Sequence, residues 1–455
     1  MYMERGSMDE PISLSVYGTT DFKNLNMRQR LAFCAAMAGH NIFITGGGGV
    51  GKSHLIAALE RHMRGIVLTA PTGVAAVNIK GQTLDRFMGF NTEYKTVHQV
   101  RKMRRDVRDR LEKLQVLLID EVGTARCDKL DLVDARLKAA KKSKEPFGGV
   151  QVIFVGDFCQ LKPVLNTKTE DGKLFQHDYG NRIYAFESES WQAANIQPHV
   201  LNEYFRQDDE MQRKILRFLR LGREIPKAVH FINQLAKGDV RDDALILCTT
   251  NSRADDINED RYQTLSGQER IYRCIIDGHF TTRPAAEVIK LKPGARVMLL
   301  SNNPEKGYSN GDMGDVVKLS PSIVTVMLDR GYSVDVEQKE WEEFEYVAGE
   351  KGIEKEVSAT FVQFPIRLAY AITIHKCQGL TLDSAIVDLT GGSFAEGQTY
   401  VALSRVRSFN NLKLAKKLSP RDVKFSPLAV DFTEYASNAA IARTGEDLEQ
   451  FPQAA

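Results

Sequence analysis

Closely spaced cysteines are missing from this chain of 455 residues, which has six cysteines in all. No two of them are closer than Cys248 and Cys274, which excludes a CxxC redox motif and a paired zinc site. Scattered single cysteines of this kind are usually reduced core residues. We therefore expect no metal other than one that arrives with a nucleotide.

Long apolar runs are missing as well. The longest one near the N-terminus, Leu31–Gly39, is far shorter than the roughly 20 residues that cross a membrane. A basic segment followed by an apolar one, the pattern of a secretory signal, is also lacking. We expect no membrane association, and a cytoplasmic location if the source is bacterial or phage-like, or a nuclear or mitochondrial one if it is eukaryotic.

A large net charge is the third absence. The chain has 61 Lys and Arg against 59 Asp and Glu, a net charge of +2. This balance does not argue against nucleic-acid binding, because a neutral protein can carry a local basic groove. Apolar residues at 43% and charged residues at 26% are ordinary for a globular protein and exclude global disorder. The length predicts about three domains.

Short apolar segments alternate with segments of helical periodicity, which favours parallel α/β sheets. In the first part of the chain we expect buried strands at Asn41–Thr45, Ile66–Ala70, Val116–Asp120 and Val150–Val155. A second such block begins near residue 198, and its expected elements are a helix at Asp209–Leu221 and strands at Ala244–Thr250 and Ser384–Leu389.

Four short β runs, separated by turn residues such as Asn310-Gly311, interrupt this second block. They are Ala295–Leu300, Asp315–Leu319, Ile323–Leu328 and Tyr332–Val336. This pattern of short β runs separated by turns indicates a small all-β barrel inserted into the second α/β domain.

A phosphate-binding loop stands between an expected strand and an amphipathic helix. Its residues are Gly46, Gly47, Gly48, Gly49, Val50, Gly51, Lys52 and Ser53, with His54 next in the helix. Glycines let backbone N–H groups surround the β-phosphate, and the helix N-terminus adds positive potential. We expect Lys52 to bridge the β- and γ-phosphates of a bound nucleotide, and the Ser53 hydroxyl to ligate Mg²⁺.

Acidic and amide side chains follow two later strands. Asp120 and Glu121 end one apolar strand, and we expect Asp120 to hold Mg²⁺ and Glu121 to orient and deprotonate the attacking water. Gln160 follows the next strand, where an amide can sense the γ-phosphate without competing for its proton.

Together with further segments, these motifs resemble the superfamily 1 helicases, and most of all the PIF-type branch, relatives of RecD and Dda. The matching segments include Ala70–Ala76, Pro146–Val152, Gly156–Leu161, Tyr204–Gln207, Ile372–Leu382 and Tyr400–Arg405. The resemblance implies two RecA-like α/β domains, a small wedge insertion in the first and an SH3-like barrel in the second. The expected division is a flexible leader at 1–21, a first domain at 22–195 with its wedge near 88–112, a second domain at 196–290 and 362–435, a barrel at 291–361, and a flexible tail at 436–455.

The resemblance also implies roles for single residues. Gln29 matches the glutamine that reads adenine, Gly379 belongs to a segment linking the DNA track to the nucleotide cleft, and Arg206 and Arg405 match two arginines that reach the γ-phosphate. A planar multi-donor cation suits the charge that develops there. The residues expected to face DNA are Pro71, Thr72, Phe87, His375 and Lys376.

The sequence departs from the family pattern at Asp85, where a histidine is usual, which puts that segment's DNA contact in doubt. Two interpretations stay open for the basic run Arg101–Arg110, a solvated helix face or a surface that meets duplex DNA. A second basic cluster between Lys138 and Lys144 is interpreted as a solvated helix end rather than a nuclear signal.

These features predict an ATP-dependent DNA helicase of replication, repair or recombination. By resemblance it moves 5′ to 3′, binds single-stranded DNA and single/double-strand junctions, and acts as a monomer. One alternative is a translocase that hydrolyses ATP on single strands and displaces proteins but separates duplex poorly. A nucleotide switch or kinase-like protein that binds no nucleic acid is disfavoured, because the second-domain motifs would have no role in it.

Overall fold

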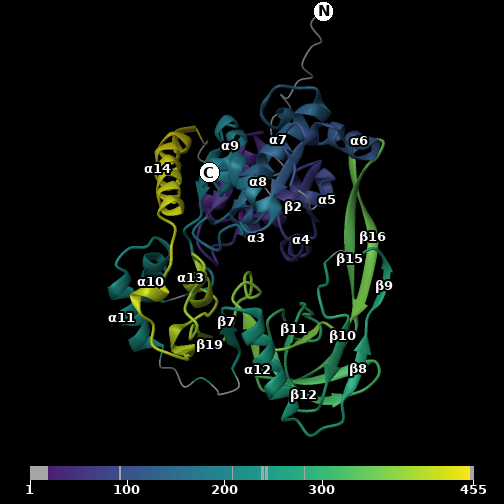
Figure 1. Ribbon diagram of the computed structural model, residues 1–455, viewed down its shortest axis with the longest axis vertical. Helices are drawn as coiled ribbons and strands as arrows, with labels where there is room; N and C mark the ends of the chain where they lie inside the picture. Colours follow the sequence, from purple (N-terminus) through teal and green to yellow (C-terminus); the bar gives the residue numbers. More distant parts are fainter. Residues whose placement is uncertain are drawn as a thin grey trace, which may run out of the picture.

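The computed structural model describes residues 19–91, 94–207, 209–236, 240, 244–280 and 282–450, with side chains as far as residue 443. Figure 1 shows two α/β units and a β-rich unit, with a long β-hairpin that runs from the β-rich unit back to the first α/β unit. Within the described residues, no helix has the length and apolar character that a membrane crossing requires. All six cysteines are free, and five of them are buried.

The first unit is built on a six-stranded sheet of order β3-β2-β4-β5-β1-β6, in which all neighbours are parallel. Its strands are β1 (Ile42–Thr45), β2 (Ile66–Ala70), β3 (Gln82–Thr83), β4 (Val116–Ile119), β5 (Gln151–Gly156) and β6 (Gln197–Val200). The four expected strands are therefore confirmed. Because the strands are parallel, the segments that follow β1, β4 and β5 meet at one edge of the sheet.

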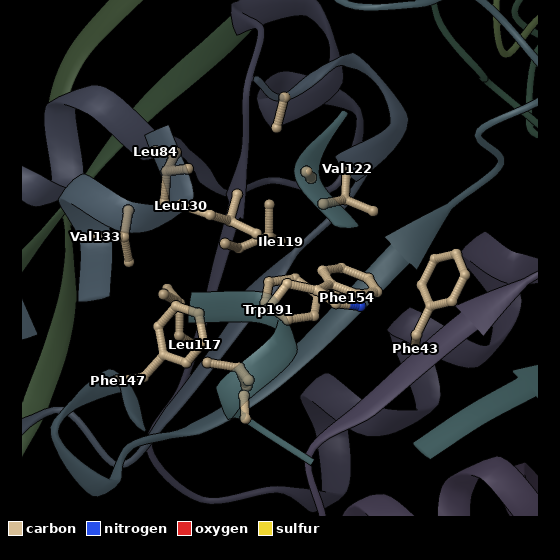
Figure 2. Packing of buried hydrophobic residues seen from close by; sticks show 14 of the residues in the cluster. Phe43, Leu84, Leu117, Ile119, Val122, Leu130, Val133, Phe147, Phe154 and Trp191 are labelled. Carbon is tan, nitrogen blue, oxygen red and sulfur yellow. The ribbon is translucent and has the colours of Figure 1, made fainter. Parts of the chain in front are cut away.

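Alternate strand residues enter two cores on opposite faces of this sheet. Phe43, Leu117 and Phe154 face α7 (Cys127–Lys141) and α9 (Glu189–Ala193), where Phe154 stacks on Trp191 with 4.6 Å between ring centroids (Figure 2). The neighbouring residues, such as Ile44, face α2 (Met27–Met37) and α3 (Lys52–His62). The remaining α-helices of this unit are α1 (Thr20–Lys23), α4 (Gly73–Asn78), α5 (Leu84–Met88), α6 (Arg105–Lys113) and α8 (Glu170–Tyr179).

The second α/β unit has a four-stranded parallel sheet of order β18-β7-β19-β20. Its strands are β7 (Ile246–Cys248), β18 (Ala371–Thr373), β19 (Ala385–Asp388) and β20 (Leu412–Leu414). Its helices are α10 (Glu210–Arg220), α11 (Ile225–Leu235), α12 (Asn251–Gln263) and α13 (Gln398–Leu403). The expected α/β class with two parallel sheets is confirmed.

The inserted β unit is larger than the predicted 291–361, because strands outside that range pair with strands inside it. A five-stranded antiparallel sheet has the order β14-β13-β12-β11-β17 and consists of β11 (Arg296–Leu299), β12 (Met313–Leu319), β13 (Ile323–Leu328), β14 (Ser333–Glu337) and β17 (Ile366–Leu368). A smaller sheet pairs β8 (Arg270–Arg273) with β10 (Val288–Leu291). The unit therefore extends from Arg270 to Leu368.

A long hairpin of β15 (Lys339–Ala348) and β16 (Ile353–Gln363), joined by β9 (Ile275–Gly278), connects this unit to the first sheet (Figure 1). Near its tip, the Tyr346 hydroxyl accepts a hydrogen bond from Leu68 N at 3.1 Å, which satisfies an N–H on β2. Glu343 forms an ion pair with Arg86, and Lys355 with Glu60. The sequence analysis did not predict this long hairpin.

Both ends of the chain depart from the predicted division. Residues 1–18 of the expected leader lie outside the described residues, and α1 already begins at Thr20. The expected tail from residue 436 is wrong as far as Gln450, because α14 spans Pro427–Gln450. This helix packs on the first unit rather than the second, since Ala429 and Val430 belong to the first core and Phe432 stacks on Phe186 at 4.1 Å.

The expected wedge region, outside residues 92 and 93, is held to the first unit by two buried arginines. Arg110 of α6 donates to Phe87 O at 2.9 Å, and Arg136 of α7 donates to Val100 O and Met88 O at 2.8 and 2.6 Å. Arg110 is therefore not part of a solvated face. Other basic residues of the run are exposed and keep both interpretations: Arg101, Lys102, Arg104, Arg105 and Arg108.

Candidate functional site

The phosphate-binding loop lies between β1 and the first turn of α3. Gly46, Gly49 and Gly51 have φ of +150°, +83° and +82°, which favours glycine over other residues. A Cβ at Gly46 would lie 2.3 Å from Leu201 O, so the loop packs directly on the backbone after β6. Ser53 and His54 are exposed at the start of α3.

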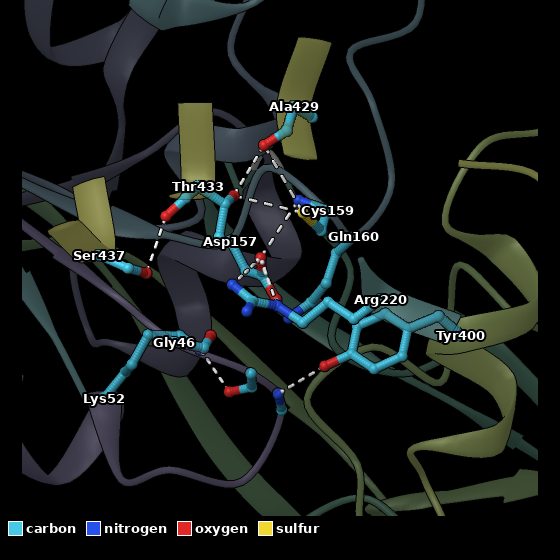
Figure 3. A network of polar contacts seen from close by, with 12 residues as sticks. Gly46, Lys52, Asp157, Cys159, Gln160, Arg220, Tyr400, Ala429, Thr433 and Ser437 are labelled. Atoms are coloured by element: carbon cyan, nitrogen blue, oxygen red, sulfur yellow. Dashed lines mark hydrogen bonds and ion pairs between the residues drawn. The ribbon is translucent and has the colours of Figure 1, made fainter. Parts of the chain in front are cut away.

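Lys52 is turned into this loop. Its Nζ donates to Gly46 O at 2.9 Å and to Gly47 O at 3.0 Å (Figure 3). Burial lowers the pKa of Lys52, and the carboxylates of Asp157 and Glu121 oppose that shift. The ammonium group is thus held beside the loop by weak carbonyl acceptors, in a place where a phosphate oxygen would be a better partner.

The acidic pair lies at the carboxyl end of β4. Asp120 Oδ1 accepts from Glu121 N at 2.9 Å, and Glu121 has a left-handed backbone with φ of +51°. Burial, and then the neighbouring Glu121, raises the pKa of Asp120 to about 7, and burial also raises the pKa of Glu121. The Asp120 carboxylate and the exposed Ser53 hydroxyl are oxygen donors of the kind that Mg²⁺ prefers.

Gln378 of the second unit reaches this pair. Its Nε2 donates to Glu121 Oε2 at 3.2 Å, from the loop after β18. The expected base is thus joined by a hydrogen bond to the segment that also contains His375 and Lys376. The resemblance placed Gln378, with Gly379, in the segment expected to link the DNA track to the nucleotide cleft, but it did not name Glu121 as the partner of Gln378.

Arg206 and Arg405 lie against the loop from the other side. A Cβ at Gly48 would be 3.1 Å from Arg405 Nη2 and 3.4 Å from Arg206 Nη1. Arg405 donates to Val401 O and Ser404 Oγ, and Arg206 donates to Thr381 Oγ1 and Ser404 O. Burial, and then Arg405, lowers the pKa of Arg206 to about 10. Two confined guanidinium groups can offset anionic charge at this place.

Two aromatic residues at the loop were missed by the sequence analysis. The Tyr400 hydroxyl accepts from Gly48 N at 3.0 Å, and burial raises the pKa of this hydroxyl. Phe205 is 59% exposed, and its ring lies 3.1 Å from the position of a Cβ on Gly51. Both lie inside motifs that the sequence analysis quoted, Phe205 directly before Arg206 and Tyr400 at the start of the segment that ends at Arg405, and this was the available signal.

Gln29 lies beside the loop, and both the oxygen and the nitrogen of its side-chain amide are already hydrogen-bonded within the protein. Its Oε1 accepts from Asn26 N at 2.9 Å in a capping box, and its Nε2 donates to Gly51 O at 3.1 Å. Only 1% of the residue is exposed. In this arrangement it fixes the end of the loop, and adenine reading stays a prediction.

Gln160 lies in the turn after β5 and donates from Nε2 to Asp157 Oδ2 at 3.3 Å. Among the described residues, no atom of the phosphate-binding loop lies within 4 Å of a Cβ placed on Gly379. The nearest atom to a Cβ placed on Gly379 is Asn78 Nδ2 of α4, at 3.9 Å. Its role in ATP binding therefore stays a prediction with no contact in its support.

Four of the five residues expected to face DNA are accessible. Thr72, His375 and Lys376 are exposed and Pro71 is half-buried. His375 stacks on Phe394, which is 58% exposed, with 6.3 Å between the rings. The prediction for Phe87 is wrong in this structure, because its ring is fully buried between Tyr346 and the guanidinium of Arg110.

Asp85, the departure from the family pattern, pairs with Lys129 at 3.0 Å. A carboxylate repels phosphate, so this pair positions the segment without offering DNA a contact. At the start of α4, a Cβ on Gly73 would meet Thr282 Oγ1 at 1.7 Å. The inserted β unit therefore lies directly against the loop that contains Pro71 and Thr72.

Comparison with known proteins gives consistent results. The family described as PIF1-like helicase matches residues 24–243. The chain is 32% identical over 422 residues to "ATP-dependent DNA helicase Pif1" of Bdellovibrio bacteriovorus, covering 90% of this chain and 91% of that protein.

Solved structures agree with this. The crystal structure of Bacteroides sp Pif1 in complex with ADP-AlF4 matches with a TM-score of 0.83 at 30% identity, over 91% of this chain and 97% of that one. Bacteroides Pif1 bound to ssDNA covers 91% and 98% at 30% identity, with a TM-score of 0.65. The arrangement described here is thus more similar to the complex with ADP-AlF4 than to the complex with ssDNA.

Proposed function

The chain belongs to the PIF1-like helicase family, and from this premise we propose that it moves 5′ to 3′ along single-stranded DNA and separates the duplex ahead of it. It is an ATP-dependent DNA helicase of the superfamily 1 type. The observation that carries the proposed mechanism is the convergence of both α/β units on one phosphate-binding loop. Tyr400, Arg206 and Arg405 come from the second unit and lie against glycines of the first.

We infer that ATP binds with its phosphates on the backbone N–H groups of residues 46–53. Lys52 then exchanges its two carbonyl acceptors for phosphate oxygens. The residues that would hold Mg²⁺ are Ser53 and Asp120, and the ion would supply positive charge to the phosphate oxygens. Phe205, which lies with Gln29 beside Gly51, would stack on the adenine.

Hydrolysis needs groups that act in the transition state. Glu121, whose pKa burial raises, is suited to take a proton from the attacking water. Arg206 and Arg405 would offset charge on the transferred phosphoryl group. Because these arginines belong to the second unit, the chemistry depends on how closely the two units approach.

DNA is proposed to cross both units, over Pro71 and Thr72 on the first and His375, Lys376 and Phe394 on the second. The hydrogen bond from Gln378 to Glu121 lies two residues from Lys376, so it offers a direct route from the DNA contacts to the base. We propose that a monomer is sufficient, because both sides of the nucleotide cleft come from one chain. Its place of action would be the cytoplasm of a bacterial or phage-infected cell, or the nucleus or mitochondrion of a eukaryotic one.

The test is steady-state ATP hydrolysis by the full chain, with and without single-stranded DNA. We expect strong stimulation by DNA in the wild type and almost none in Lys52→Ala. Among the described residues, the hydrogen-bond partners of Lys52 Nζ are two loop carbonyls, so thermal unfolding of the variant should stay near that of the wild type. Hydrolysis that single-stranded DNA leaves unchanged would contradict the proposal.

A further inference from the structure

The turn that contains Gln160 is attached to the second unit by a buried ion pair. Arg220, the last residue of α10, donates to the carboxylate of Asp157 after β5, with Nε–Oδ2 at 3.0 Å and Nη2–Oδ1 at 2.9 Å (Figure 3). The Asp157 side chain is 0% exposed and that of Arg220 is 10% exposed. The pair therefore joins the two units inside the nucleotide cleft.

The same carboxylate shapes the turn. Asp157 Oδ1 accepts from Cys159 N at 3.1 Å, and Oδ2 accepts from the Gln160 amide at 3.3 Å. Arg220 and Gln160 thus share one acceptor oxygen. On the far side of the turn, Cys159 Sγ lies 3.3 Å from Thr433 Oγ1 of α14 (Figure 3). The orientation of the Gln160 amide depends on a carboxylate whose charged partner belongs to the other unit.

The pair also affects Lys52. Burial opposes ionisation of Asp157, but Arg220, and to a smaller extent Lys52, holds the pKa of that carboxyl below its usual range. Burial lowers the pKa of Lys52, and among the nearby charges Asp157 opposes that shift most strongly. Without Arg220, the Asp157 carboxylate would be buried with Lys52 as its remaining cation, and removing one partner of a buried pair leaves such a charge uncompensated.

We propose that Arg220 is a positioning residue for ATP hydrolysis, which holds Asp157 so that it orients Gln160. Since α10 belongs to the second unit, Arg220 makes the geometry of the first-unit turn depend on the position of the second unit. This inference rests on the proposed ATP-dependent function. It assigns Arg220 a part in hydrolysis beyond that of a packing residue.

The experiment is a double-mutant cycle between Arg220→Met and Gln160→Ala, with DNA-stimulated kcat and KM as readouts. Loss of positioning costs on the order of 10²-fold in rate, so we expect a fall of about that size in kcat for Arg220→Met. The double variant should be no slower than the slower single variant, because Arg220 acts through Gln160. Arg217→Met, at an exposed arginine on the same helix, is the matched control and should keep the wild-type rate.

Two results would overturn the inference. One is a folded Arg220→Met variant with near wild-type kcat, and the other is a double variant whose losses multiply. If Arg220→Met fails to fold, Asp157→Asn with Arg220→Met removes both charges. The inference then predicts a restored fold with kcat still low, whereas full recovery of kcat would show that the pair only stabilises. A wild type without DNA-stimulated hydrolysis would contradict the proposed function instead.

Discussion

The hydroxyl of Tyr400 accepts a hydrogen bond from the backbone N–H of Gly48 at 3.0 Å, across the boundary between the two α/β units (Figure 3). Backbone N–H groups of such a loop are the donors that a nucleotide phosphate requires. A phosphate oxygen bound to this N–H would compete with the hydroxyl, so we expect the hydroxyl to move away when ATP binds. Nucleotide binding and the position of α13 are coupled through this one contact.

Tyr400→Phe should consequently bind nucleotide more tightly in the absence of DNA. The net contribution of one hydrogen bond is about 1 kcal/mol. Because the variant no longer has to break this bond when nucleotide binds, its affinity should rise roughly fivefold. Titration with a fluorescent ADP analogue measures it, and Tyr435→Phe, at an exposed tyrosine of α14, serves as control. Weaker binding by Tyr400→Phe would mean that the hydroxyl assists the nucleotide.

Arg405→Ala should separate ATP binding from hydrolysis. The loop, Asp120 and Gln29 all lie in the first unit, so ATP affinity should stay within a few-fold of wild type. Turnover should fall by roughly 10³ or more, the usual worth of an arginine that meets the transferred phosphoryl group. Arg405→Lys should rescue it poorly, because a point charge does not reproduce the planar fork. Turnover near the wild-type rate would show that Arg405 has only a structural role, through its hydrogen bonds with Val401 and Ser404.

Lys376→Ala should weaken binding to single-stranded DNA. If this exposed lysine meets one phosphate, the dependence of log K on log salt should become shallower by about 0.7. Fluorescence anisotropy with a labelled oligonucleotide at several salt concentrations measures the slope. Lys144→Ala, in the basic cluster interpreted as a solvated helix end, should leave the slope as it is. An unchanged slope for Lys376→Ala would remove it from the DNA track.

His199 predicts a loss of stability in acid. It is buried in β6, its Nε2 has no hydrogen-bond partner among the described residues, and burial, with Arg443 and His40 nearby, lowers its pKa to about 4. Since the folded pKa lies below the unfolded one of about 6.5, the neutral folded form is favoured above pH 6.5, and stability is lost as pH falls from 6.5 towards 4.

Between pH 7.5 and pH 5 this residue should cost the folded state about 2 kcal/mol. His199→Phe removes that cost, so its free energy of unfolding, followed in urea, should gain on the wild type by about this amount at pH 5. His230→Phe, at an exposed histidine of α11, is the control. If the difference in free energy of unfolding between the wild type and His199→Phe is the same at pH 7.5 and pH 5, the account is contradicted.

The sequence predicted the first sheet well because its strands are short apolar runs followed by motif residues. Parallel strands bring such residues to one edge, so Lys52 and Glu121 could be placed together without a structure. Long-range pairing left no such signal. The charged alternation of β15 and β16 gave no indication that Tyr346 would reach Leu68, and with that contact the burial of Phe87 was missed.

Arg220 shows the same limit for the site. An arginine at the end of a helix is usually solvated, and its partner Asp157 lies 63 residues away in the other unit. Local pattern cannot distinguish such a pair from two surface charges. Likewise, residues 436–455 were predicted to be a flexible tail, although Ala436 of α14 packs without exposed surface.

The most direct test of the central claim is strand displacement on duplexes with one single-stranded tail. The full chain, ATP and Mg²⁺ would be mixed with matched substrates that differ only in the end of the tail. The account predicts rapid separation of the 5′-tailed duplex, little separation of the 3′-tailed one, and none by Lys52→Ala. Separation of the 3′-tailed duplex instead, or DNA-stimulated hydrolysis with neither duplex separated, would contradict it.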